Sequence, residues 1–342
     1  MYTDILTVNV SDREGVNRLF RLLDNFETHN MTVCVVGASC VGKSTLIYEY
    51  DKGVDMDVVL FGDEKNASIL TKEEVEYACS DPWTPEIGEF MNQKTKEYCV
   101  PEIGSPVFGT VCVPADILIY IYIDNSILAE RIKKRNATLE SVLDMKASIE
   151  MDIQIAALQV CEALVVVDVQ EGCVNEEWPE WELILNKVRE CVSQIEDLIV
   201  TARDLDIEII WIRSVEWKKD KLQSNLERAY LNDPDVCFYN EGLKESVIPA
   251  WPNERVFYKN HPSIGVNSEF QQYISQKCTV GICGIYSTGC VNSCIEITSA
   301  AGCFNYVFSR EVETFDSKRN QQFQEMLKQH WHYLGIANVL DL

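Results

Sequence analysis

The first residues that could do chemistry form a glycine-rich segment near the N-terminus. Residues 37–45 spell G-x-x-x-x-G-K-S-T, after a short apolar run and before a helical pattern that starts at about Lys43. Glycines let backbone N–H groups converge on phosphate, a helix N-terminus adds partial positive charge, and the lysine reaches the terminal phosphates. The segment predicts a site for ATP or GTP with Mg²⁺, in which Ser44 is the metal ligand. Its members are Gly37, Ala38, Ser39, Cys40, Val41, Gly42, Lys43, Ser44 and Thr45.

Residues farther along this half could complete the site. Arg131 and Arg135 follow the run ILIYIYID, and the stretch resembles the strand and arginine-bearing lid of small nucleoside and nucleotide kinases. The resemblance implies that these arginines stabilise a transferred phosphoryl group, although a solvated basic helix face is the alternative. This half could be a small-molecule kinase with the main activity, or a non-catalytic nucleotide sensor. Three acids near predicted strand ends could hold Mg²⁺ or be solvated loop residues: Asp63, Glu102 and Asp124.

Three segments of the second half carry a different chemistry. ALVVVDVQEGCV places Asp168 at the end of an apolar run, ERVFYKNHPSIGVNSEF contains Lys259, and GIYSTGCVNSCIEITSAAG contains Cys290. In this order and spacing, they resemble the isochorismatase-like cysteine hydrolases, and the resemblance runs through most of residues 163–342. It implies that Cys290 is a nucleophile in a triad with Asp168 and Lys259.

The chemistry of these residue types agrees with that implication. The thiolate is the reactive form of cysteine, and we expect a helix N-terminus and Lys259 to lower the pKa of Cys290. Asp168 would accept the thiol proton and pass it to the leaving group. The backbone N–H groups of Tyr286 and Cys290 would form an oxyanion hole, and the resemblance implies a cis peptide bond between Ile285 and Tyr286. We therefore expect hydrolysis of an amide or ureide C–N bond through a covalent Cys290 intermediate, with no cofactor in this half.

Several other residues in the second half leave alternatives open. Cys290 could be one more buried cysteine among fourteen, and Cys294 is interpreted as a core residue. His261 is a rival partner for the thiol. Nicotinamidases of this superfamily carry an Asp-x-His metal motif, but the corresponding segment IIWIRSVEWKKD has no histidine, which disfavours a metal-dependent nicotinamidase. Arg213 could bind a carboxylate or ureido group of a substrate or form a structural ion pair, and Gly289 could widen the pocket.

These residues need elements that bring them together, and both halves alternate predicted strands with helices. The pattern predicts an α/β fold with two three-layer α/β/α domains, each a largely parallel sheet covered on both faces. We expect an N-terminal extension at 1–30, a P-loop NTPase-like domain at 31–158 and an isochorismatase-like, Rossmann-like domain at 159–342. Predicted strands are 31–36, 57–61, 107–113, 117–124, 163–168, 207–212, 279–285 and 304–308; the main predicted helices are 126–136, 138–160, 181–204, 290–301 and 317–333.

Composition limits the kind of protein this is. The 342 residues suggest about two domains. A net charge of -24 argues against binding to nucleic acid or to an anionic membrane surface. There is no apolar run of about 20 residues, and residues 1–12 do not resemble a signal peptide. Fourteen cysteines without a C-x-x-C pair indicate a reducing cytoplasm. We expect small-molecule substrates and, from the family resemblance, a homo-oligomer.

Overall fold

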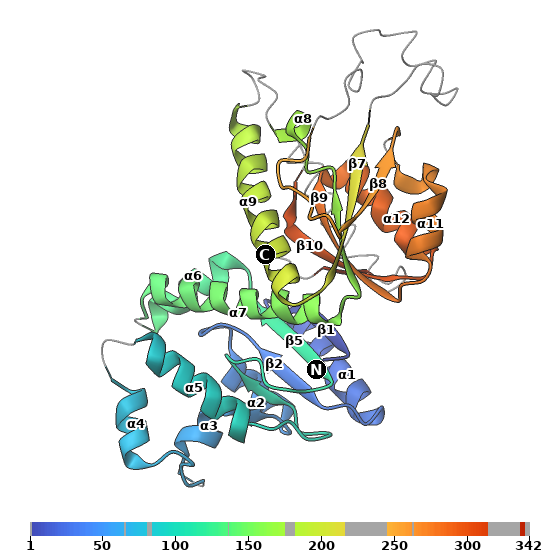
Figure 1. Cartoon of the computed structure of the whole chain (residues 1–342). Coiled ribbons are helices and arrows are strands. Elements are labelled where there is room, and N and C mark those ends of the chain that lie inside the picture. Colours follow the sequence, from blue (N-terminus) through green and yellow to red (C-terminus); the bar gives the residue numbers. More distant parts are fainter. Residues whose placement is uncertain are drawn as a thin grey trace. The chain divides into compact units, whose positions relative to one another are not determined.

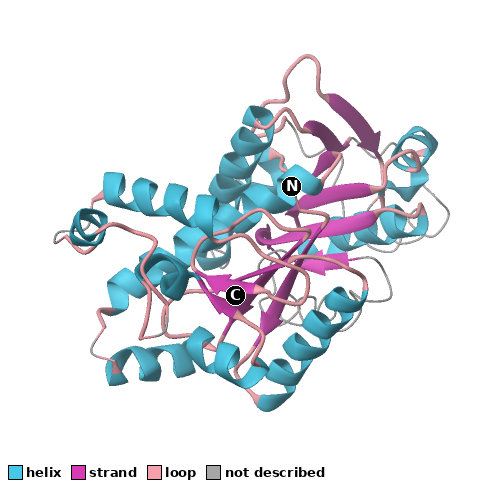
Figure 2. Cartoon of the chain, turned by 90° about the horizontal axis from the view of Figure 1, so that it is seen from below, coloured by secondary structure: helices cyan, strands magenta, loops and turns pink. Residues whose placement is uncertain are grey.

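The chain divides into two compact units, residues 1–156 and 157–342. In each unit, a parallel sheet lies among helices (Figures 1 and 2). In the part of the chain that the structure describes, no helix combines the length and apolar character needed to cross a bilayer. The structure is a computed structural model that describes residues 2–64, 66–80, 84–135, 137–174, 182–215, 245–261, 263–313 and 336–338.

The first unit contains a five-stranded sheet in the order β1-β5-β2-β4-β3, and every strand pair is parallel. All residues of β2 are buried, and successive residues of a strand point to opposite faces, so helices must cover both faces. The strands are β1 (Asp4–Asn9), β2 (Val33–Val36), β3 (Val54–Asp55), β4 (Val107–Gly109) and β5 (Ile117–Tyr122). The helices are α1 (Arg13–Thr28), α2 (Lys43–Tyr50), α3 (Met56–Phe61), α4 (Lys72–Ala78), α5 (Pro85–Tyr98), α6 (Asn125–Lys134) and α7 (Leu139–Val160).

The N-terminal residues are an integral part of this sheet. Residues 1–30, expected as an N-terminal extension, contain strand β1 and the amphipathic helix α1. Strand β1 forms the edge of the sheet and pairs with β5, from Asp4 opposite Ile117 to Asn9 opposite Tyr122. This segment therefore supplies a strand to the first unit rather than extending from it.

One predicted strand of the first unit is wrong. Residues 57–61 lie in helix α3, and β3 is limited to Val54 and Asp55. Asp55 is the N-cap of α3, where its side chain accepts a hydrogen bond from the backbone N–H of Asp57 at 3.0 Å. A short apolar run fits a buried helix as well as a strand, and here the cap decides.

The second unit contains a six-stranded sheet in the order β11-β10-β9-β6-β7-β8, again with every pair parallel. Helix α9 lies on one face, and α11 and α12 lie on the other (Figure 1). The strands are β6 (Ala163–Val167), β7 (Glu208–Ser214), β8 (Arg255–Lys259), β9 (Thr279–Ile285), β10 (Phe304–Glu313) and β11 (Ile336–Asn338). The helices are α8 (Glu171–Val174), α9 (Glu182–Asp204), α11 (Ser268–Ile274) and α12 (Asn292–Ala300).

The core of this unit explains why its sequence pattern was informative. All five residues of the central strand β6 have no exposed surface, as expected for a parallel strand with helices on both sides. The predicted strands at 163–168, 207–212, 279–285 and 304–308 are confirmed within a few residues. The helix predicted at 317–333 lies outside the described residues.

Candidate active site

The ends of three parallel strands bring the predicted triad together. Asp168 directly follows β6, Lys259 is the last residue of β8, and Cys290 follows β9 after a short turn. Because carboxyl ends of parallel strands meet at one edge of a sheet, residues far apart in sequence become neighbours there. Strand β7 lies between β6 and β8, and its Ser214 is the register partner of Lys259. The long lysine side chain bridges the distance to Asp168.

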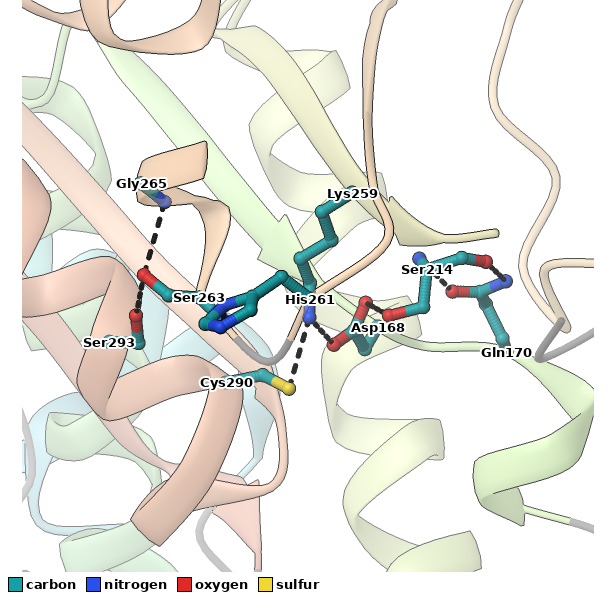
Figure 3. Close-up of polar contacts among 9 residues, drawn as sticks. All are labelled: Asp168, Gln170, Ser214, Lys259, His261, Ser263, Gly265, Cys290 and Ser293. Carbon is teal, nitrogen blue, oxygen red and sulfur yellow. Dashed lines mark hydrogen bonds and ion pairs between the residues drawn. The ribbon is translucent and has the colours of Figure 1, made fainter. Parts of the chain in front are cut away.

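The three side chains are in direct contact (Figure 3). Lys259 Nζ lies 2.6 Å from Asp168 Oδ2 and donates a hydrogen bond to Cys290 Sγ at 3.1 Å. The side chains of Lys259 and Asp168 are each only 1% exposed. The lysine therefore connects a buried carboxylate with a thiol that is partly exposed.

Burial and charge set the protonation of the triad. Burial alone would lower the pKa of Lys259, but the negative charge of Asp168 and the contact with Cys290 Sγ outweigh it and hold this pKa above its ordinary value. Burial, together with the charge of Asp168, raises the pKa of the Cys290 thiol to about 12, and the charge of Lys259 opposes both. The expectation of a lowered thiol pKa is therefore wrong for the resting site: Lys259 acts in the predicted direction, but desolvation is larger. A nearby base must remove the proton.

Tyr286, which was predicted to help form the oxyanion hole, stabilises the turn that contains Cys290. The cis peptide bond between Ile285 and Tyr286 is present. The Tyr286 carbonyl accepts hydrogen bonds from the N–H groups of Gly289 at 3.1 Å and Val291 at 3.3 Å. The Tyr286 hydroxyl donates to the Cys173 carbonyl at 2.5 Å. These bonds fix the turn; oxyanion binding by the N–H groups of Tyr286 and Cys290 remains a prediction.

The other residues singled out in this half of the sequence lie outside the triad. Cys294 has no exposed surface and belongs to the hydrophobic core, as interpreted from the sequence. His261 Nδ1 accepts a hydrogen bond from the Ser263 N–H at 2.9 Å, and burial followed by the charge of Lys259 lowers the pKa of this histidine. The guanidinium of Arg213 lies over the Trp211 ring, 5.5 Å from its centroid. A Cβ added at Gly289 would meet no described atom within 4 Å, which leaves open space beside the nucleophile.

The glycine-rich segment of the first unit forms a loop between β2 and α2. Gly42 is the N-cap of α2 with φ +105°, a conformation that favours glycine. Lys43 Nζ donates to the carbonyls of Gly37 at 2.7 Å and Ala38 at 3.0 Å. Burial lowers the pKa of Lys43 to about 8, and the carboxylates of Asp57 and Asp55 partly oppose this shift.

A cavity of about 410 Å³ adjoins this loop, and both candidate lid arginines line it. Arg131 Nη1 donates to the Val41 carbonyl at 2.6 Å and so holds α6 against the loop. Arg135 and Lys134 line the same cavity, together with Thr45. Cationic side chains therefore gather here in a chain whose net charge is -24.

The acids predicted as Mg²⁺ partners have other contacts. Asp124 Oδ1 accepts from Asn9 Nδ2 at 2.9 Å, and Asp63 Oδ1 accepts from the Asn66 N–H at 2.7 Å. The backbone of Glu102 forms a bridge with Ser105. The carboxylates whose charge acts on Lys43 are instead those of Asp55 and Asp57, which the sequence did not single out. Within the described residues, there is no group of three or more His, Cys, Asp and Glu arranged to hold a metal ion.

Comparisons with known proteins identify the second unit. A family profile described as the isochorismatase domain matches residues 162–333, half of the chain. The chain therefore belongs to the isochorismatase family of hydrolases. The match starts at residue 162, so the chemistry of the first unit stays a prediction. No curated protein matches the chain.

Three of the solved structures that match part of the chain are described as a cysteine hydrolase, an isochorismatase family protein and a pyrazinamidase. A cysteine hydrolase from Pseudomonas syringae pv. phaseolicola 1448A is 15% identical, covers 52% of this chain and 88% of its own, and has a TM-score of 0.43. An isochorismatase family protein from Desulfovibrio vulgaris subsp. vulgaris str. Hildenborough is 14% identical, with coverage of 52% and 93% and a TM-score of 0.41. Pyrazinamidase of Pyrococcus horikoshii, solved with zinc, is 17% identical, with coverage of 51% and 96% and a TM-score of 0.40.

Proposed function

We propose that the second unit hydrolyses an amide or ureide C–N bond of a small molecule through a thioester or thiocarbamate on Cys290. The observation that carries this proposal is the contact of Lys259 Nζ with both Asp168 Oδ2 (2.6 Å) and Cys290 Sγ (3.1 Å). A thiol whose pKa is raised to about 12 needs a base within its own site, and a buried carboxylate beside a cation meets that need.

In the proposed first half-reaction, the Cys290 thiol gives its proton to Asp168 while Sγ attacks the substrate carbonyl carbon. Lys259 stabilises the negative charge on sulfur, and the N–H groups of Tyr286 and Cys290 bind the oxyanion. When the tetrahedral intermediate collapses, the C–N bond breaks and Asp168 passes its proton to the leaving nitrogen. An amide leaves a thioester and a ureide leaves a thiocarbamate on Cys290, and an amine or ammonia is released.

In the second half-reaction, water attacks the thioester or thiocarbamate carbon and gives a proton to Asp168. The C–S bond then breaks, and sulfur takes the proton back from Asp168. An amide substrate releases a carboxylic acid, and a ureide releases a carbamic acid. The site thereby returns to its starting protonation, and each step uses only the three triad residues, the two backbone donors and water.

The test is amine or ammonia release from a panel of small amides and ureides. Cys290→Ala is expected to abolish release from any substrate that the unaltered protein cleaves. Cys278→Ala is the matched control, because Cys278 is an exposed free cysteine of the same unit. If amine or ammonia release continued at an unchanged rate in Cys290→Ala, the assignment of Cys290 as the nucleophile would be refuted.

We propose a second function for the first unit, the binding of ATP or GTP with Mg²⁺ at residues 37–45. The loop before α2, the half-buried Lys43 and the cavity beside them support it. Lys43 would exchange its carbonyl acceptors for phosphate oxygens, Ser44 would ligate Mg²⁺, and the cavity would take the rest of the nucleotide. The bound nucleotide would serve phosphoryl transfer or regulation.

Calorimetric titration with ATP and GTP in the presence of Mg²⁺ tests this second proposal. Lys43→Ala is expected to abolish binding, while Lys133→Ala, an exposed lysine of α6, is expected to leave it unchanged. Equal affinity in both variants would contradict the proposal. Transfer of phosphate to members of a nucleoside panel would favour the kinase over the sensor.

A further inference from the structure

The second oxygen of Asp168 is held by a side chain from the neighbouring strand. Ser214 Oγ donates a hydrogen bond to Asp168 Oδ1 at 3.1 Å, while Lys259 pairs with Oδ2 (Figure 3). Ser214 is 3% exposed. An ionised carboxylate can only accept hydrogen bonds, so the serine hydroxyl is the donor. Both oxygens of the carboxylate thus have a partner, one from β7 and one from β8.

Gln170 fixes Ser214 in place. The Ser214 N–H donates to Gln170 Oε1 at 2.8 Å, and Gln170 Nε2 donates to the Ser214 carbonyl at 3.1 Å. These two bonds pair the side-chain amide with the backbone of one residue, which ties the segment after β6 to the end of β7. Gln170 is only 1% exposed, so breaking the pair would leave buried polar groups unsatisfied.

The backbone around Asp168 depends on the same strand end. Asp168 has φ +52°, a region that a residue other than glycine holds only where its surroundings fix it. Its N–H donates to the Ile212 carbonyl at 3.0 Å, and the Val215 N–H donates to the Lys259 carbonyl at 2.9 Å. The end of β7 therefore sets the positions of both charged members of the triad.

We propose that Ser214, held in place by Gln170, is a positioning residue that orients the Asp168 carboxylate to accept the proton of the Cys290 thiol. This inference rests on the proposed hydrolase function. A hydrogen bond donated to a carboxylate favours its charged form, and the charged form is the one that can accept the thiol proton. Ser214 and Gln170 act through Asp168.

Two variants of nearly equal shape isolate the hydroxyl. Ser214→Thr keeps it and Ser214→Val replaces it with a methyl group. The readout is the rate at which iodoacetamide alkylates Cys290, measured by peptide mass spectrometry over a range of pH. On the acid side, this rate falls as the base becomes protonated. Loss of the donor should move that fall to higher pH by about one unit, because hydrogen bonds to charged groups are the stronger ones.

We expect Ser214→Thr to follow the unaltered protein and Ser214→Val to show the shift. Ser214→Ala should show the same shift of the pH profile. Because alanine is smaller than serine, this variant tests the proposal even if the valine side chain does not fit at position 214. Profiles of Ser214→Val and Ser214→Ala that coincide with that of Ser214→Thr would overturn the proposal.

A separate control distinguishes this inference from the function on which it rests. Asp168→Asn should remove the acid-side fall in the unaltered Ser214 background. If the alkylation rate of Cys290 has the same pH profile in Asp168→Asn as in the unaltered protein, the proposed hydrolase mechanism itself fails. If the profile depends on Asp168 but not on Ser214, only the positioning role fails.

Discussion

Replacing Lys259 by methionine tests the buried ion pair directly. The substitution keeps the length and most of the apolar part of the side chain but removes the ammonium group. Because both side chains are 1% exposed, Asp168 would keep a charge without its partner away from water. Removing one partner of a buried pair costs about 3–5 kcal/mol of unfolding free energy. Asp168→Asn in the same chain removes the remaining charge and should recover most of that loss.

A second lysine pair of the same unit provides the matched control. Lys277 Nζ lies 2.7 Å from Glu208 Oε2, but these side chains are 19% and 31% exposed. Solvent screens such a pair, so Lys277→Met should cost only about 0–1 kcal/mol. The two lysine variants thus make the same chemical change at similar distances and differ in burial.

Urea unfolding followed by tryptophan fluorescence measures the difference, since six of the seven tryptophans belong to residues 157–342. With a slope of about 2–3 kcal/mol per molar urea, Lys259→Met should lower the midpoint by about 1–2 M. The reasoning about the buried ion pair would be refuted if Lys259→Met lost no more unfolding free energy than Lys277→Met. It would also be refuted if adding Asp168→Asn to Lys259→Met restored none of that loss.

Two further predictions concern other parts of the chain. In Gly284→Ala, the new Cβ would lie 2.3 Å from the Val167 carbonyl oxygen at φ +137°, so a loss of about 3 kcal/mol or more is expected in thermal unfolding, whereas Gly289→Ala should cost under about 0.5 kcal/mol. In the first unit, Lys43 is charged below its pKa of about 8, so the affinity for ATP should fall by up to tenfold per pH unit above that value. Calorimetry that shows constant affinity from pH 7 to 9.5 would contradict binding of phosphate by Lys43.

Much of the fold could be predicted because its strands are buried on both faces. Strand β6 appears in the sequence as an uninterrupted apolar run, and β9 consists of apolar residues and glycine after its first threonine, as a parallel sheet under two helix layers requires. Residues 57–61 were wrongly predicted as a strand, because an apolar run of this length is compatible with either a strand or a helix. There the side chain of Asp55 decides, through one hydrogen bond.

The parts that could not be predicted depend on contacts between distant residues. The pairing of β1 with β5 joins segments that are more than a hundred residues apart, and no local pattern specifies that edge. Ser214 carries no signal of its own, since its role follows from its register opposite Lys259. The pKa of Cys290 was expected to fall because sequence shows the lysine and the helical pattern but not the extent of burial.

The measurement that tests the central claim most directly is the mass of the intact protein quenched during turnover of a cleavable amide. We predict a transient increase equal to the acyl group of the substrate, located by peptide mapping on Cys290 and absent in Cys290→Ala. Turnover without any such adduct, or an adduct located on another cysteine, would contradict the assignment of Cys290 as the nucleophile.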